Sequence, residues 1–206
     1  FNPPSGSTFG PGSTPVLVTA TDECGNFSTC TFNVINDGMN EITAAVELGG
    51  GVMANGPFTR GITFELWNTG VNNLAPLHTT CQTLTFSGDF PVAKTGTATF
   101  LVPCQPTGYT CITGRDRLHT LRRTIDPLPI TGPAYTPSFT GAEALIGGNL
   151  NDDKFIDILD FGIYTLQDLT VAPGGVNTTC PQVPPFRHAD INGTASGVVN
   201  SRDFSF

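Results

Sequence analysis

The chain has 206 residues, of which 38% are hydrophobic and 13% charged, enough for one or two domains with cores of their own. Nine Lys and Arg stand against 17 Asp and Glu, so the cations that neutralise phosphates are scarce and no nucleic-acid partner is expected. No apolar run is long enough to span a membrane. The 24 Gly and 17 Pro predict many turns and few long helices, and hence a mainly β protein.

Residues 1–37 are expected to form β structure. Apolar and polar residues alternate in Val16–Thr21 and again in Phe27–Val34, and Glu23–Asn26 has the composition of a tight turn. Two strands around such a turn make a hairpin, and an isolated hairpin is only marginally stable in water. We therefore expect another segment to cover it.

This region resembles the second half of a hyalin repeat, an immunoglobulin-like extracellular module. The matching residues are Ser5–Phe9, Val18–Asp22, the Cys24–Asn26 turn and Thr29–Phe32. The resemblance covers some 35 residues and lacks the first strands of the family. It implies that the chain begins inside a domain, with the other half either preceding Phe1 or supplied by a neighbouring subunit.

Residues 38–140 are predicted to form an antiparallel β-sandwich of immunoglobulin or jelly-roll type, in which Phe64 and Trp67 fill the core. Short alternating or apolar runs bounded by Gly, Pro, Asn or Asp give six candidate strands: Glu41–Leu48, Gly61–Trp67, Thr80–Phe86, Thr95–Val102, Thr110–Thr113 and Leu118–Ile125.

Six cysteines in a chain without a CxxC pair favour disulfides, and therefore an oxidising, extracytoplasmic setting. The sequence does not choose their pairing. Cys24 and Cys30 either bond to each other across the hairpin or wait for absent partners. Cys104 is close enough in sequence to bridge to Cys111, and Cys81 competes equally with either.

A basic cluster lies at Arg115–Arg123 and holds four of the seven arginines. One interpretation is a strand whose outward charges pair with nearby acids. The other is a contact patch for an anionic polysaccharide or for the acidic end of another copy. His78 and His119 have no carboxylate or thiol at a spacing that indicates catalysis.

Between residues 149 and 160 oxygen-bearing side chains recur at the spacing of a calcium loop. Ca²⁺ takes six to eight oxygen ligands, and this spacing wraps them around one ion. Ile156 is expected to anchor the loop in a core, and a following helix to bury Leu159, Ile163 and Leu166. The predicted ligands are Asn149, Asn151, Asp153, the Phe155 carbonyl, Asp157 and Asp160.

A second loop follows at Asp190–Asp203 and matches the first if two extra residues are allowed. It has fewer carboxylates and should bind Ca²⁺ more weakly. The predicted ligands are Asp190, Asn192, Thr194 or Ser196, the Val198 carbonyl, Asn200 and Asp203. Between the loops, Val171–Pro185 is rich in Pro and Gly and is expected to be a surface excursion.

The two loops resemble the type I dockerin, a small module of two calcium-loop-and-helix repeats. The resemblance covers roughly residues 145–206 and implies the ligands named above, so residues 141–206 are expected to form a dockerin-like module. Asn149 stands where the family usually has Asp, and the second loop carries an insertion. In dockerins, positions 10 and 11 of each loop help select a cohesin partner; here they are Ile158-Leu159 and Ser201-Arg202, which argues against symmetric docking.

No nucleophile elbow, zinc-protease motif or phosphate loop is present, so we expect no enzymatic activity. The leading hypothesis is a calcium-stabilised structural or adhesive protein, secreted or at a bacterial cell surface, whose copies complete one another into a fibre. The alternative is a fragment of a secreted enzyme complex that binds polysaccharide or docks a cohesin-like partner. Trp67, Tyr109, Tyr135 and Tyr164 are its candidate sugar platforms.

Overall fold

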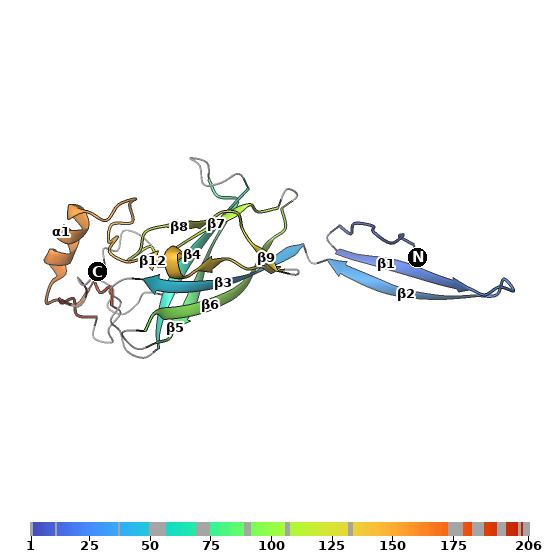
Figure 1. Cartoon of the computed structure of the whole chain (residues 1–206), viewed down its shortest axis with the longest axis horizontal. Helices are drawn as coiled ribbons and strands as arrows, with labels where there is room; N and C mark the ends of the chain where they lie inside the picture. Colours follow the sequence, from blue (N-terminus) through green and yellow to red (C-terminus); the bar gives the residue numbers. More distant parts are fainter. Residues whose placement is uncertain are drawn as a thin grey trace. The chain divides into compact units, whose positions relative to one another are not determined.

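The computed structural model divides the chain into two compact units, Phe1–Asn40 and Glu41–Phe206. Both are built mainly from β-strands (Figure 1). Residues 38–140 and 141–206, two modules in the sequence-based prediction, both lie in the second unit apart from the first three residues. The structure describes residues 2–10, 12–36, 38–49, 57–68, 75–88, 92–105, 108–131, 134–172, 179–182, 188–192, 197–201 and 203.

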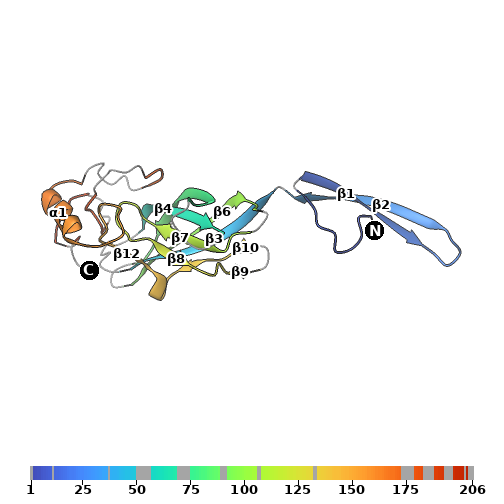
Figure 2. The same ribbon diagram turned by 90° about the horizontal axis from the view of Figure 1, so that it is seen from above.

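The first unit is an antiparallel hairpin of β1 (Gly12–Thr21) and β2 (Phe27–Asn36), seen from two directions in Figures 1 and 2. The connecting turn is held by Asp22, whose carboxylate accepts hydrogen bonds from the backbone and side-chain nitrogens of Asn26. Gly25 adopts a positive φ of 84° there, which favours glycine. The predicted strands and turn are confirmed.

The described residues of the second unit form two sheets. In one, β5 (His78–Phe86), β4 (Phe58–Trp67), β7 (Cys111–Arg115) and β8 (Arg123–Ile125) follow in that order. The other is built on β3 (Met39–Gly49), which pairs with β6 (Lys94–Pro103). Short strands also belong to this sheet: β9 (Ile130–Thr131), β10 (Ala134–Tyr135), β11 (Ser138–Phe139) and β12 (Leu145–Ile146).

One apolar core joins the two sheets of the second unit. Alternate residues of β3 and β4 point into it, and Phe64 packs against Phe100 and Phe139 with ring centroids 5.2 and 5.9 Å away. Trp67 is also buried, so the expectation that Phe64 and Trp67 fill the interior is confirmed. This packing is that of a β-sandwich. The sheet built on β3 is not antiparallel throughout as predicted, because β10, β11 and β12 pair with β3 in parallel.

The predicted strand Leu118–Ile125 is largely wrong, because only Arg123–Ile125 is a strand, β8. The preceding residues form a turn that Asp116 closes with its own side chain: Oδ1 accepts from the Leu118 amide at 3.0 Å. The Asp116 amide in turn donates to the Thr120 hydroxyl. A short polar side chain offers the backbone these bonds in place of a β-ladder.

The last third of the described chain contains a short 3₁₀ helix, η1 (Gly141–Glu143), and the helix α1 (Ile158–Gln167). A second small core gathers here from Leu150, Ile163, Ala172, Ala189, Ile191 and Val199. Ile163 is buried as predicted, but Leu159 and Leu166 are exposed. The inward face of α1 is instead made by Asp160 and Ile163, three residues apart, so that prediction is corrected.

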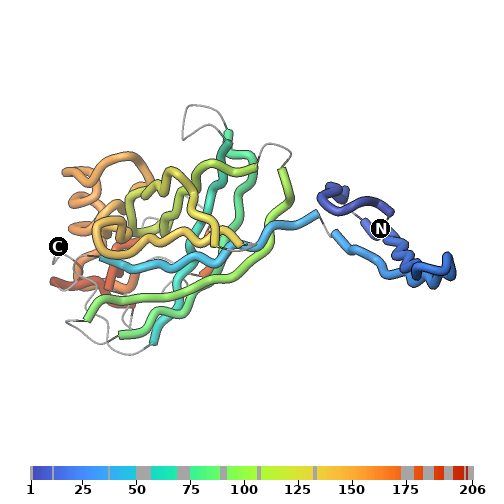
Figure 3. Tube along the Cα trace, turned by 45° about the vertical axis from the view of Figure 1, so that its right-hand side comes forward, coloured from blue at the N-terminus to red at the C-terminus, as the bar shows by residue number. Residues whose placement is uncertain are grey.

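A disulfide joins Cys81 on β5 to Cys180. Gln182, two residues further on, is buried against the sandwich, so this part of Val171–Pro185 is not the expected surface excursion. Figure 3 shows the Cα trace on which these segments can be followed. None of the described helices has the length and apolar character required to cross a bilayer.

Candidate metal centre

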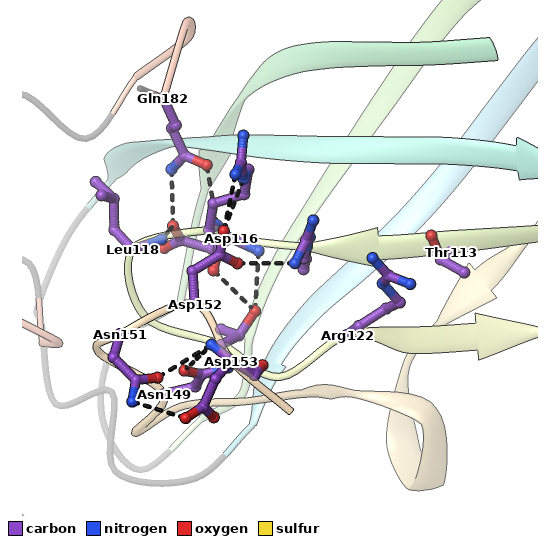
Figure 4. A network of polar contacts seen from close by, with 12 residues as sticks. Thr113, Asp116, Leu118, Arg122, Asn149, Asn151, Asp152, Asp153 and Gln182 are labelled. Carbon is purple, nitrogen blue, oxygen red and sulfur yellow. Dashed lines mark hydrogen bonds and ion pairs between the residues drawn. The ribbon is translucent and has the colours of Figure 1, made fainter. Parts of the chain in front are cut away.

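The first predicted calcium loop is closed by its own polar side chains. Asn149 accepts from the Asp153 amide at 3.2 Å and donates to the Asp153 carbonyl at 2.8 Å. Asn151 donates to Asp153 Oδ2 at 2.7 Å, and Asp153 Oδ1 accepts from the Phe155 amide at 2.7 Å. The first three predicted ligand side chains are therefore held together (Figure 4).

Asp157 and Asp160 connect this loop to α1. Asp157 caps the helix by accepting from the Leu159 amide at 2.8 Å, and the Asp160 side chain accepts from the Asp157 amide in return. This reciprocal arrangement satisfies two backbone donors at the helix start. Asp160 is buried, and its other oxygen accepts from the Leu150 amide at 2.6 Å, across the loop.

The second loop repeats this arrangement around Asp203. Its carboxylate accepts from the Asn192 amide at 3.0 Å and from the Asn200 amide at 2.8 Å. In each loop, the last predicted ligand thus accepts two hydrogen bonds from backbone amides. One amide lies near the start of the loop, and the other lies three residues before the ligand itself. Thr194 and Ser196 lie outside the described residues.

Two carboxylates of the second loop are buried side by side. Asp190 and Asp203 are each 1% exposed. The pKa of Asp203 is raised because burial disfavours its charge; the neighbouring charge of Asp190 and a hydrogen bond with Asp190 add to the rise. Like charges in such a place are stable together only when a proton or a cation lies between them.

The sandwich holds the first loop through its arginines. Asp152, which follows Asn151 in a left-handed conformation with φ of 58°, accepts from Arg115 Nη1 at 2.8 Å and from Arg117 Nη2 at 2.8 Å. Arg115 also pairs with Glu65 on β4 at 3.2 Å. Asp152 is directed to this side of the loop, away from the cluster of Asn149, Asn151 and Asp153 (Figure 4).

This arrangement accounts for the basic cluster 115–123. Arg122 pairs with Glu65 at 3.1 Å, and Arg123 donates to the carbonyls of Ala142 and Ala144. The cluster therefore pairs with nearby acids and carbonyls, which confirms that part of the first interpretation made from the sequence. The expected strand is wrong for Arg117 and Arg122, which lie between β7 and β8.

The second loop is held by Arg60, a fully buried residue of β4. Its Nη2 donates to the backbone carbonyls of Asp190 at 3.3 Å and Ile191 at 2.9 Å. Its Nη1 lies 3.4 Å from Asp116 Oδ2. A buried cation of the sandwich thus fixes the backbone at the start of the loop.

His119 lies in the same network and does have a carboxylate partner, contrary to the prediction. Its Nδ1 lies 2.6 Å from Asp116 Oδ2, and its Nε2 lies 2.9 Å from His188 Nδ1. Gln182 completes the network by donating to Asp116 Oδ1 at 2.7 Å. The three-residue spacing of Asp116 and His119 could have indicated this pair from the sequence. Nothing in the sequence indicates that His188 and Gln182 join it.

The charges of this network follow from its burial. Burial and the charge of Arg60 lower the pKa of His119 to about 3. Burial raises the pKa of Asp116, but contacts with His119 and Arg60 outweigh it and lower the value to about 2. At neutral pH, a neutral imidazole therefore donates through Nδ1 to an ionised carboxylate, and Arg60 supplies the countercharge.

The carboxylates of the two loops supply only some of the oxygen ligands that a hard cation such as Ca²⁺ requires. Among the described residues, no three Asp, Glu, His or Cys side chains gather closely enough to hold a metal by themselves. Asn amides and backbone carbonyls would have to complete either set, as Ca²⁺ accepts. The Val198 carbonyl accepts from Asn200 Nδ2 at 3.1 Å. The carbonyl roles of Phe155 and Val198 stay predictions.

An apolar groove of about 310 Å³ lies beside the loops, where Ile156, Phe161 and Tyr164 line one part and Leu150 and Ile191 another. Ile156 is 41% exposed and contributes to this groove, so it does not anchor the loop in a closed core as expected.

The chain matches no protein-family model, no curated protein and no solved structure. The hyalin and dockerin resemblances therefore stay predictions, and the function must be argued from the geometry.

Proposed function

We propose that this chain is a non-catalytic structural or adhesive protein of the cell exterior, that Ca²⁺ bound in a dockerin-like C-terminal module stabilises it, and that its copies associate into a surface fibre or matrix. The observation that carries the proposal is the pair of similarly built loops. Each ends in a buried Asp, Asp160 or Asp203, whose carboxylate ties the loop together.

Burial of Asp190 beside Asp203 supports a cation in particular. Ionised carboxylates removed from water are costly unless they are paired, and a divalent ion between them removes that cost. The oxygen-only character of both predicted ligand sets favours Ca²⁺ over Zn²⁺ or Cu²⁺, which prefer nitrogen and sulfur.

The setting outside the cytoplasm is supported by the Cys81–Cys180 disulfide, since such bonds persist under oxidising conditions. Calcium at extracellular, roughly millimolar concentration also suffices for sites of modest affinity.

Three observations favour a structural role over the alternatives. The Asp116–His119 pair is fully buried, and the cavity beside it, about 10 Å³, is barely enough to admit one water molecule and too small for a substrate. Arg115, Arg117 and Arg122, which an anionic polysaccharide would have to contact, are paired within the chain. Two of the four candidate sugar platforms, Trp67 and Tyr109, are buried.

The test is the stability of the full chain in calcium and in chelator. Trp67 is the single tryptophan and lies in the sandwich, so its fluorescence follows unfolding of the second unit. Because Ca²⁺ should bind only the folded loops, we expect calcium at a hundred times its dissociation constant to raise the free energy of unfolding by about 2.7 kcal/mol per site.

Variants Asp153→Ala and Asp190→Ala should each remove part of this increase, whereas Glu143→Gln, which removes an exposed charge outside the loops, should leave it intact. Magnesium serves as the control ion. A transition that is unchanged by calcium, or Asp variants that respond as the wild type does, would exclude the calcium sites.

A further inference from the structure

The hairpin of the first unit leaves most of its surface uncovered. Val16 is the one buried apolar side chain among its described residues, while Phe27 is 73% and Ile35 77% exposed. Two-stranded hairpins are marginal in water, and three or more strands are needed for independent stability. Pairing with another strand would therefore stabilise this unit.

The bonding pattern shows where a strand can be added. Leu17 exchanges backbone hydrogen bonds with Asn2, at 2.9 and 3.0 Å, so its N–H and C=O point away from β2. Its partner Thr31 is consequently in a non-hydrogen-bonded pair, and its own N–H and C=O point outward from β2. Because hydrogen-bonded and non-hydrogen-bonded pairs alternate along the hairpin, every second residue of both strands likewise points its N–H and C=O outward.

The edge of β1 is already protected. Asn2 occupies it at Leu17, and Pro15, at the preceding outward position, has no N–H to offer. The segment before β1 lies on this side of the hairpin in Figures 1 and 2.

The edge of β2 carries no such protection. No charged residue, proline or glycine interrupts it, and among the described residues no strand other than β1 pairs with it. Long uncharged edges of this kind are templates for pairing with another chain. The outward residues are Phe27, Thr29, Thr31, Asn33 and Ile35.

We infer that this edge pairs with the same edge of a second copy of the chain. The inference rests on the proposed association of copies and names one contact for it. The two β2 strands run antiparallel about a two-fold axis at Thr31, giving a continuous four-stranded sheet in which each β1 is an outer strand.

This register is self-complementary. It places Phe27 opposite Ile35 of the second copy, Thr29 opposite Asn33 and Thr31 opposite Thr31. The two most exposed apolar residues of β2 thus cover each other on one face. Five hydrogen-bonded residue pairs exchange about ten backbone bonds, and no like charges meet because the strand has none.

The first test compares Thr31→Lys with Thr19→Lys in the full chain, by light-scattering mass over a range of concentrations. Thr31→Lys places two ammonium groups opposite each other at the axis, while Thr19→Lys puts the same charge on the same face of β1. We expect wild type and Thr19→Lys to reach at least twice the 21.7 kDa of one chain and Thr31→Lys to lose this association. A wild-type monomer throughout, or a Thr31→Lys mass equal to wild type, would overturn the inference.

The second test reports the register without disturbing the fold. The exposed cysteines outside the disulfide, Cys24, Cys30 and Cys104, are first replaced by Ser. Added to this parent, Thr31→Cys brings two Cα atoms to about 5.5 Å across the axis, within disulfide range, so mild oxidation should link most chains as dimers. Thr19→Cys and the parent should not link. Cross-linking of Thr31→Cys no stronger than that of the parent would exclude this register.

Failure here is distinct from failure of the proposed function, because Trp67 lies in the second unit. A calcium-stabilised chain whose Thr31→Lys variant associates as the wild type does would exclude the β2 contact alone. A calcium-stabilised chain that stays monomeric would exclude both this contact and the proposed association of copies. A β2-dependent dimer whose Trp67 transition ignores calcium would exclude the calcium sites alone.

Discussion

Arg60 contacts groups from several segments of the second unit. It contacts Asp116, His119 and the carbonyls of Asp190 and Ile191, and it lies over the ring of Phe58. A guanidinium suits this place because it stays charged when buried and its planar fork donates in several directions. One sandwich residue thereby holds both the turn at Asp116 and the start of the second loop.

Replacing Arg60 by Met should destabilise the second unit by about 3–5 kcal/mol, because Asp116 is left as a buried charge without its cation. Urea unfolding followed by Trp67 fluorescence measures the loss. Lys154→Gln, which removes an exposed cation from the first loop, is the control and should change stability by no more than about 0.5 kcal/mol. A loss of under 1 kcal/mol for Arg60→Met would show that Asp116 finds another partner.

Among the elements, β4 brings the parts of the second unit together. It pairs with β5 and β7, supplies Arg60 and Glu65, and carries Gly61, over which residues 179–182 lie. A methyl group on Gly61 would stand 3.0 Å from the Cys180 nitrogen and 3.1 Å from its sulfur. Glycine is needed here because another backbone segment approaches closely. The backbone angles of Gly61 themselves do not require glycine.

Gly61→Ala should therefore destabilise the second unit by about 1–3 kcal/mol through overpacking. Gly162→Ala is the matched control: it adds the same methyl group in α1, where nothing lies within 4 Å. That variant should be stabilising, by up to about 1 kcal/mol, because alanine is the better helix former. Thermal unfolding in chelator compares the two, and equal shifts of the same sign would contradict the packing argument.

At the scale of the whole molecule, the described chain consists of two units with different sources of stability. The second has a shared apolar core, a buried polar network and a disulfide across 99 residues of sequence. The first has a single hairpin with one buried apolar side chain among its described residues. The proposed pairing of β2 with a second copy would supply the further strands that such a hairpin lacks.

Replacing Cys81 and Cys180 together by Ala should lower the unfolding free energy of the second unit by about 2–4 kcal/mol, because the unfolded chain regains the freedom that a long closed loop denies it. Chemical denaturation of oxidised and variant chains, read at Trp67, gives the difference. Cys24→Ser, in the other unit, should leave the transition unchanged. A double variant as stable as wild type would mean that the polar network alone holds residues 179–182.

Elements whose signals are local could be predicted from the order of the amino acids. Alternation of apolar and polar residues located the hairpin and most strands of the sandwich, because each strand shows one face to its core. The spacing of oxygen-bearing residues grouped Asn149, Asn151 and Asp153, because such side chains bond to the nearby backbone wherever the loop lies.

Features that depend on contacts between distant segments could not be predicted and are seen in the folded chain. The pairing of Cys81 with Cys180, the bonds of Arg60 to the carbonyls of Asp190 and Ile191, and the exposure of Leu159 and Leu166 all follow from how the last third of the chain lies on the sandwich. The periodicity of apolar residues shows which face of a helix is the more apolar. It does not show how large an apolar surface the rest of the chain offers for that face to pack against. Arginine likewise shows its charge in the sequence, but its partner becomes known only when the chain has folded.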